Sequence, residues 1–121
     1  MAAPTALNVI VDETEYSRYE SERAVVGVTV NLTPVTGLSG EQIRLELIKA
    51  RRARDAIVAT QTVTIPSNNA EFVSGSFDLR AIEDADRINL IRHGDYFVRA
   101  TSVTTATVTA NSPDFRVSIL S

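Results

Sequence analysis

The sequence predicts an all-β fold, an antiparallel sandwich of about seven strands with one short helical crossover, formed by a single domain over residues 1–121. The clearest sign is at the C-terminal end, where Gly94 to Ala100 and Asn111 to Ile119 both alternate apolar and polar residues after a turn. Turn-forming residues also recur about every eight to twelve positions, a spacing typical of sandwiches. The composition, 44% hydrophobic and 22% charged, suits a folded domain with one core.

Two strands are expected in the first third of the chain. Leu7 to Val11 is a short apolar run that suits a first strand. Ala24 to Leu32 alternates more regularly than any other segment, and its inward residues are Val26, Val28, Val30 and Leu32. The segment between these strands, Asp12 to Arg23, is acidic and contains two tyrosines, and we expect it to be a loop.

A hairpin is expected in the middle of the chain. In its first strand, Gln42 to Ala50, the residues expected to face inward are Ile43, Leu45 and Leu47, and those expected to face outward are Arg44 and Glu46. Helix is the competing interpretation because Glu41 to Ala56 contains good helix formers, but the apolar residues alternate and do not recur at three and four. After a charged turn, Ile57 to Ile65 returns with one shared face: Ile57, Ala59, Gln61, Val63 and Ile65.

The remaining elements complete the sandwich. Glu71 to Leu79 alternates as a strand, and Gly75 within it indicates a bulge or close packing. From Arg80 to Arg92 apolar residues recur at every third position, which predicts the helical crossover. In the last two strands the residues expected to face the core are Tyr96, Val98 and Ala100, then Phe115, Val117 and Ile119.

The charge and the N-terminus argue against several classes of protein. A net charge of −3 disfavours a nucleic-acid binder, because such domains present an excess of Lys and Arg. No stretch reaches the roughly 18 apolar residues of a membrane span, so we expect no membrane insertion. The N-terminus lacks the basic region and apolar core of a signal peptide, so synthesis in the cytoplasm is expected, or a leader has been replaced.

No catalytic, metal-ligating or cofactor-binding residue is expected. The chain has no cysteine, and its one histidine, His93, lies in a turn with no serine elbow elsewhere. The acidic residues around Asp12 do not follow a calcium-loop pattern, and those around Glu83 suit a solvated helical face. Paired-carboxylate glycoside hydrolysis would need a deep groove, which a domain this small rarely forms.

Two features point to contact with a protein partner. Eleven of the twelve basic residues are arginine, the basic residue enriched at protein interfaces, although genomic base composition is the favoured explanation of the bias. The stretch from Thr101 to Thr109 is uncharged and rich in β-formers, so it forms either the last hairpin or an edge that lies against another subunit. The candidate interface residues are Arg51, Arg52, Arg54, Thr101, Thr105, Thr107 and Thr109.

The C-terminal stretch resembles a family of modules. The Gly-x-Tyr of Gly94 to Tyr96 and the Phe-x-Val of Phe115 to Val117 are similar to the ending of immunoglobulin-like modules, including the fibronectin type III group. The resemblance covers about a quarter of the chain and implies an immunoglobulin-like sandwich. It implies no activity, because unrelated proteins with many functions share this architecture.

We therefore expect a non-catalytic structural protein that attaches to a larger assembly, such as a decoration or cementing subunit of a viral (phage) particle. Its partner would be a capsid protein or another lattice, and it could also form a homo-oligomer. The alternative is a carbohydrate- or ligand-binding module on an extracellular surface, whose stacking platform would use Tyr16, Tyr19 or Phe97. A third interpretation is a fragment of a larger multidomain surface protein.

Overall fold

The computed structural model describes residues 4–17, 24–33, 38–50, 56–67, 70–79 and 94–118. Within these ranges the chain forms nine strands and no helix, which confirms the all-β prediction. The expected helical crossover, Arg80 to Arg92, lies outside the described residues.

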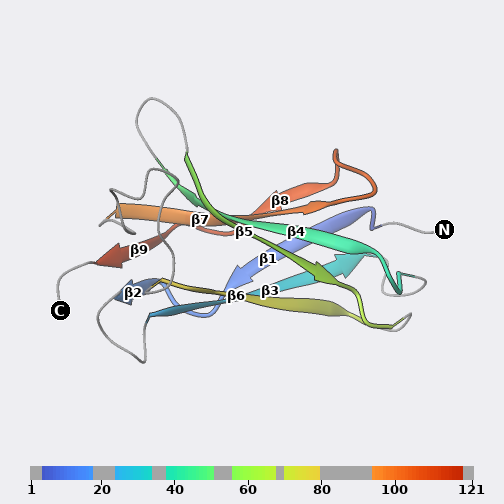
Figure 1. Cartoon of the computed structure of the whole chain (residues 1–121), viewed down its shortest axis with the longest axis horizontal. Helices are drawn as coiled ribbons and strands as arrows, with labels where there is room; N and C mark the ends of the chain where they lie inside the picture. The colour runs from blue at the N-terminus through green and yellow to red at the C-terminus, as the bar shows by residue number, and fades with distance from the viewer. Residues whose placement is uncertain are drawn as a thin grey trace.

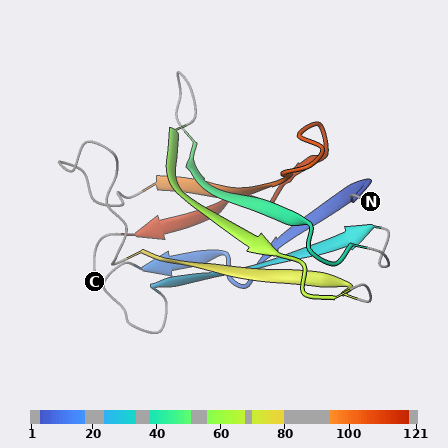
Figure 2. The same cartoon turned by 45° about the vertical axis from the view of Figure 1, so that its right-hand side comes forward.

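The strands form two sheets that pack face to face, as Figures 1 and 2 show from two directions. The first sheet has the order β1-β3-β6, with β1 at Ala6–Val11, β3 at Val25–Thr33 and β6 at Phe72–Asp78. The second has the order β2-β9-β7-β4-β5, and β8 also pairs with β7. Its strands are β2 (Glu15–Ser17), β4 (Gln42–Lys49), β5 (Ala56–Thr64), β7 (Gly94–Ser102), β8 (Thr109–Asn111) and β9 (Phe115–Ser118). The predicted sandwich is confirmed.

The strand pairs are antiparallel except for β2 and β9, which run parallel. Strand β7 lies inside its sheet, between β4 on one side and β8 and β9 on the other. Strands β8 and β9 are two halves of one neighbour of β7, separated at Pro113, which has no amide hydrogen to continue the ladder. Ser112 bridges the break, because its hydroxyl accepts a hydrogen bond from the Val98 amide at 2.9 Å.

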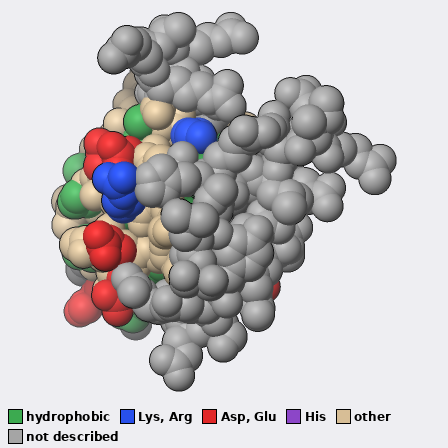
Figure 3. Space-filling model, turned by 90° about the vertical axis from the view of Figure 1, so that its left-hand side faces the viewer, with side chains coloured by type: hydrophobic (Ala, Val, Ile, Leu, Met, Phe, Trp, Pro, Cys, Tyr) green, Lys and Arg blue, Asp and Glu red, His purple; other side chains and the backbone are tan. Residues whose placement is uncertain are grey.

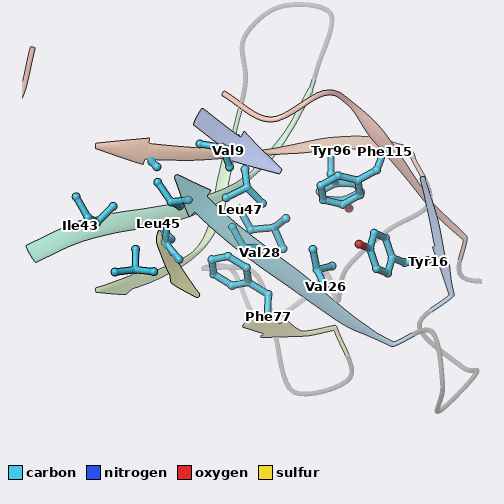
Figure 4. Close-up of a cluster of buried hydrophobic side chains, with 14 of the residues drawn as sticks. Val9, Tyr16, Val26, Val28, Ile43, Leu45, Leu47, Phe77, Tyr96 and Phe115 are labelled. Carbon is cyan, nitrogen blue, oxygen red and sulfur yellow. The ribbon is translucent and has the colours of Figure 1, made fainter. Parts of the chain in front are cut away.

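The core lies between the sheets, and alternation in the sequence predicted most of it (Figure 4). The inward residues expected on β3, β4 and β7 are all buried: Val26, Val28, Val30, Leu32, Ile43, Leu45, Leu47, Tyr96, Val98 and Ala100. Phe115 and Val117 are buried as predicted, whereas Ile119 lies outside the described residues. Since burying one such side chain contributes roughly 1.5–3 kcal/mol, this core accounts for the cohesion of the two sheets.

The prediction of a loop from Asp12 to Arg23 is wrong at its centre, where β2 pairs with β9. The chain leaves the first sheet after Val11 and enters the second at Glu15, so this acidic stretch is the link by which the chain changes sheets. The link is held by Asp12, whose carboxylate accepts hydrogen bonds from the Tyr16 hydroxyl and, at 3.1 Å, from the Gly27 amide. The Tyr16 hydroxyl in turn accepts a hydrogen bond from the Glu13 amide at 2.9 Å.

One predicted orientation on the central hairpin, that of Ile57, is also wrong. The pairing of β4 with β5 shifts register between Leu47 and Ile48, and Ile57 then pairs with Ile48 on the outer side of the sheet. Ile57 is therefore 55% exposed and does not share the inward face expected for it. The outward orientation predicted for Glu46 is confirmed, since it lies on the outer side with Arg44, although its side chain is only 8% exposed.

Candidate interaction surface

Strand β5 ends the larger sheet, and no described strand pairs with its outer edge. An edge strand presents a row of unpaired amide and carbonyl groups, which other chains can use as a template. Proteins usually block such edges with short strands, charges or proline. β5 runs for nine residues without a charge or a proline, and its one irregularity is the register shift near its start, beside Leu47.

The side chains of β5 also present little to keep another strand away. Thr60, Thr62 and Thr64 are exposed on its outer face, and Ala59 and Val63 are half-buried on its inner face. No charged residue occurs between Asp55 and Glu71 in the sequence. The edge is therefore neutral over its whole length.

A groove of about 610 Å³ opens between the end of β5 and the start of β6. Its apolar lining includes Val63, Pro66 and Phe72, and Phe72 is 52% exposed, although it is a large aromatic side chain. Phe72 is the one large apolar side chain of this lining that is exposed, and it lies beside an unpaired strand edge, where another chain could cover it. We call β5 and this groove together the β5 edge surface.

Beside this groove, a side-chain hydrogen bond joins β5 of the larger sheet to β6 of the smaller sheet. Gln61 reaches from β5 to β6, where its Oε1 accepts a hydrogen bond from the Ser76 amide at 3.1 Å. Gly75 makes room for this bridge, because a Cβ there would lie 2.8 Å from Gln61 Oε1 and 2.6 Å from Leu45 Cδ1. The sequence prediction of close packing at Gly75 is confirmed. The bridge also occupies part of the edge of β6, which leaves β5 as the more open of the two strands.

Apart from Ile48, Ile57 and Phe97, which are neighbours at one end, the described outer face of the larger sheet is polar and locally paired. Arg44 Nε lies 3.9 Å from Glu46 Oε1, and Arg99 Nε donates a hydrogen bond to Asn111 Oδ1 at 3.2 Å. The Arg99 guanidinium also lies 5.8 Å from the centre of the Phe97 ring. On the described part of the side that faces left in Figure 1, acidic and basic side chains again lie next to one another (Figure 3). Such locally neutralised surfaces offer no field of one sign to attract a charged partner.

The four candidate interface threonines lie in the β7–β8 hairpin. Thr101 pairs with Thr109 across β7 and β8, their hydroxyl oxygens lie 3.0 Å apart, and Thr101 is buried. Thr105 is half-buried, whereas Thr107 and Thr109 are exposed. The stretch therefore forms the last hairpin, and contact of its exposed threonines with another subunit stays a prediction. The three candidate arginines, Arg51, Arg52 and Arg54, lie outside the described residues.

The proposed surface aromatics are wrong for the two that the structure describes. Tyr16 is 1% exposed, and its ring meets the Phe115 ring edge-on with 5.1 Å between centroids (Figure 4). Phe97 is 7% exposed on the other side of the larger sheet. Tyr19 lies outside the described residues. Neither Tyr16 nor Phe97 can therefore serve as a stacking platform for a sugar.

Other polar groups in the described ranges hold the structure together. Glu41 is buried, and its Oε2 accepts a hydrogen bond from Thr104 at 2.5 Å, which ties the β7–β8 hairpin to the start of β4. A second groove, of about 480 Å³, separates β1 from the break between β8 and β9. Among the described residues no three His, Cys, Asp or Glu side chains lie close enough together to hold a metal ion. The same part of the chain contains no helix able to cross a membrane.

No protein-family model and no curated protein matches this chain. Among solved structures it is similar to part of a β-glucosidase from Listeria innocua in complex with gluconolactone, with a TM-score of 0.56 and 13% identity. The match covers 94% of this chain and 16% of that enzyme. A β-glucosidase from Erythrobacter marinus gives a TM-score of 0.49 at 16% identity, over 93% of this chain and 15% of that one. The chain thus spans about a sixth of the length of these enzymes. At this identity the likeness shows the fold alone.

Proposed function

We propose that this chain is a non-catalytic structural protein of the immunoglobulin-like type, which attaches to a larger assembly through the β5 edge surface. The observation that carries the proposal is the neutral, nine-residue edge of β5. Addition of a strand to such an edge is a common mode of protein recognition, because main-chain hydrogen bonds supply affinity and neighbouring pockets supply specificity. A subunit that decorates or cements a viral (phage) particle is the kind of protein that this surface suits.

The order of the strands supports the immunoglobulin-like part of the proposal. A three-stranded sheet packs on a sheet in which β5, β4 and β7 are neighbours, and the last segment of the chain pairs with β7. Sandwiches of fibronectin type III and related modules have this two-sheet architecture. The non-catalytic part rests on the sequence, which has no cysteine and one histidine.

A module within a larger multidomain protein is the second candidate, and the solved structures favour it. The fold recurs as a 16% portion of the chain of an enzyme named as a β-glucosidase. In that case the β5 edge surface would pack against another domain of the same protein. The sugar-binding alternative has less support, because two of its three candidate aromatics are buried.

The proposal is tested by the mass of the native assembly. Material from the natural source is fractionated on a density gradient, and mass spectrometry counts the copies of this chain in each fraction. A particle or complex that contains the chain in a fixed whole-number ratio to another protein supports the accessory function. Recovery of the chain only at 13.2 kDa would refute it, and recovery within a longer polypeptide would favour the multidomain candidate.

A further inference from the structure

We propose that the β5 edge pairs with the β5 edge of a second copy, so that two larger sheets join into one continuous sheet across a two-fold axis. The inference builds on the proposed function, since it names this chain as its own partner at the surface described above. A two-fold axis perpendicular to the sheet reverses the direction of the strand, so the two copies of β5 run antiparallel. The inner faces of the two sheets then lie on the same side.

The charge of the surface selects an uncharged occupant. An extended segment that lies along β5 contacts a strand with no ionisable side chain, and the neighbouring groove contributes one carboxylate, Glu71. A charged occupant would lose hydration there without gaining an opposite charge. β5 itself meets the requirement, and two copies can approach through it despite a net charge of −3 each.

The sequence of β5 complements itself when the axis passes through Gln61. Residues whose numbers add up to 122 then lie opposite each other, so each Thr60 faces a Thr62 on the outer side. On the inner side each Ala59 faces a Val63. Thr–Thr pairs and apolar pairs across antiparallel strands are both stabilising. The regular part of the strand, which begins after the register shift beside Leu47, contains all of these residues.

The other described edges suit this pairing less well. β2 has three residues, β6 ends in Asp78 and gives its Ser76 amide to Gln61, and β1 lies against β8. β5 is the longest terminal strand and is neutral throughout.

The expected dimer is weak. A standard interface buries about 800 Å² of the surface of each partner. For this chain, which exposes 6990 Å², such an interface would take up more than a tenth of the accessible surface. One pair of edge strands covers less than such an interface, even where Phe72 and the groove add apolar contact. We therefore expect a dimer that dissociates on dilution.

The test measures the mass of the purified chain by sedimentation equilibrium from about 1 µM to about 1 mM, a range that brackets weak association. The expected result is a rise from 13.2 kDa toward twice that mass. In the Thr62→Lys variant the two new lysines would occupy diagonal positions across the pair, with their backbones roughly 7–8 Å apart, and we expect the dimer to weaken at least about tenfold. The matched control is Thr107→Lys, which adds the same charge at an exposed threonine of the β7–β8 hairpin and should leave the dimer unchanged.

Hydrogen exchange on the unaltered chain provides a second measurement that needs no substitution. Amide groups of β5 should exchange more slowly at high than at low protein concentration, whereas those of the β7–β8 hairpin should not change. A monomer at every concentration, equal weakening by both lysine substitutions, or protection outside β5 would overturn the inference. A monomer that is still found in a larger assembly would overturn self-pairing and leave the proposed function standing. A β5-linked dimer found in no larger assembly would support self-pairing and overturn the proposed function.

Discussion

The hydroxyl of Tyr16 holds the link by which the chain changes sheets, and Tyr16→Phe removes it while the ring stays. The hydroxyl donates to the Asp12 carboxylate and accepts from the Glu13 amide. A hydrogen bond to a charged group contributes about 1.5–3 kcal/mol, and one between neutral groups about 0.5–1.5 kcal/mol. Asp12 and Glu13 are exposed, so water replaces part of each bond in the variant. We expect a loss of about 2 kcal/mol in the free energy of unfolding, or about 8 °C in Tm for a domain of this size.

Urea denaturation followed by circular dichroism measures this loss, and a double-mutant cycle with Asp12→Ala identifies its source. If the Tyr16–Asp12 bond carries the effect, the two substitutions together should cost about 1 kcal/mol less than the sum of each alone. Thr29→Val is the matched control, because it removes a half-buried strand hydroxyl for which no hydrogen bond is found within the described residues. An unchanged stability of Tyr16→Phe, or strict additivity with Asp12→Ala, would refute the assignment.

Three further outcomes follow from the same structure. Burial, together with the hydrogen bond to Asp12, raises the pKa of Tyr16 above its ordinary value near 10. The resulting stability is complete below pH 10 and is lost as the pH rises further, so urea unfolding between pH 8 and pH 11 should show a steeper alkaline decline in the unaltered protein than in Tyr16→Phe. Gly75→Ala should cost about 1–3 kcal/mol in the free energy of unfolding, since its Cβ would overlap Leu45, and urea unfolding measures this loss. Leu45→Ala should cost about 2–5 kcal/mol because the side chain is wholly buried, whereas thermal unfolding of Val103→Ala, at an exposed position, should shift little.

Alternation predicted the inward faces well wherever a strand is regular and has neighbours on both sides. β3 and β7 are of this kind, and every inward residue expected on them is buried. The prediction is wrong at Ile57 because the register shift beside Leu47 changes the side to which the end of β5 points. A bulge of this kind leaves no signal in the composition. The sequence therefore keeps alternating through the bulge, although the side chains beyond it have changed to the other face of the sheet.

Tyr16 shows why local chemistry misplaces a residue. The residues before it, Asp12 to Glu15, are exposed and mostly acidic, and a strand of three residues is too short to show alternation. What buries Tyr16 is the ring of Phe115, about a hundred positions farther along the chain. The parallel pairing of β2 with β9 brings the two rings together, and no pattern near Tyr16 encodes that pairing.

Sequence alone also could not locate the candidate site, because two segments of similar composition lie at different places in the larger sheet. Ala56 to Thr64 and Thr101 to Thr109 are both uncharged and rich in threonine and valine. In the second segment Thr101 bonds to Thr109 within the hairpin, and β7 has strands on both sides. In the first, β5 pairs with β4 along one edge, and the main-chain groups of its other edge face outward with no described strand beside them. Composition identifies a strand that would pair readily, but the order of strands decides whether the fold already supplies its partner. Threonine-to-lysine substitutions at positions 62 and 107 therefore separate the two influences, since they alter similar sequences in different places of the sheet.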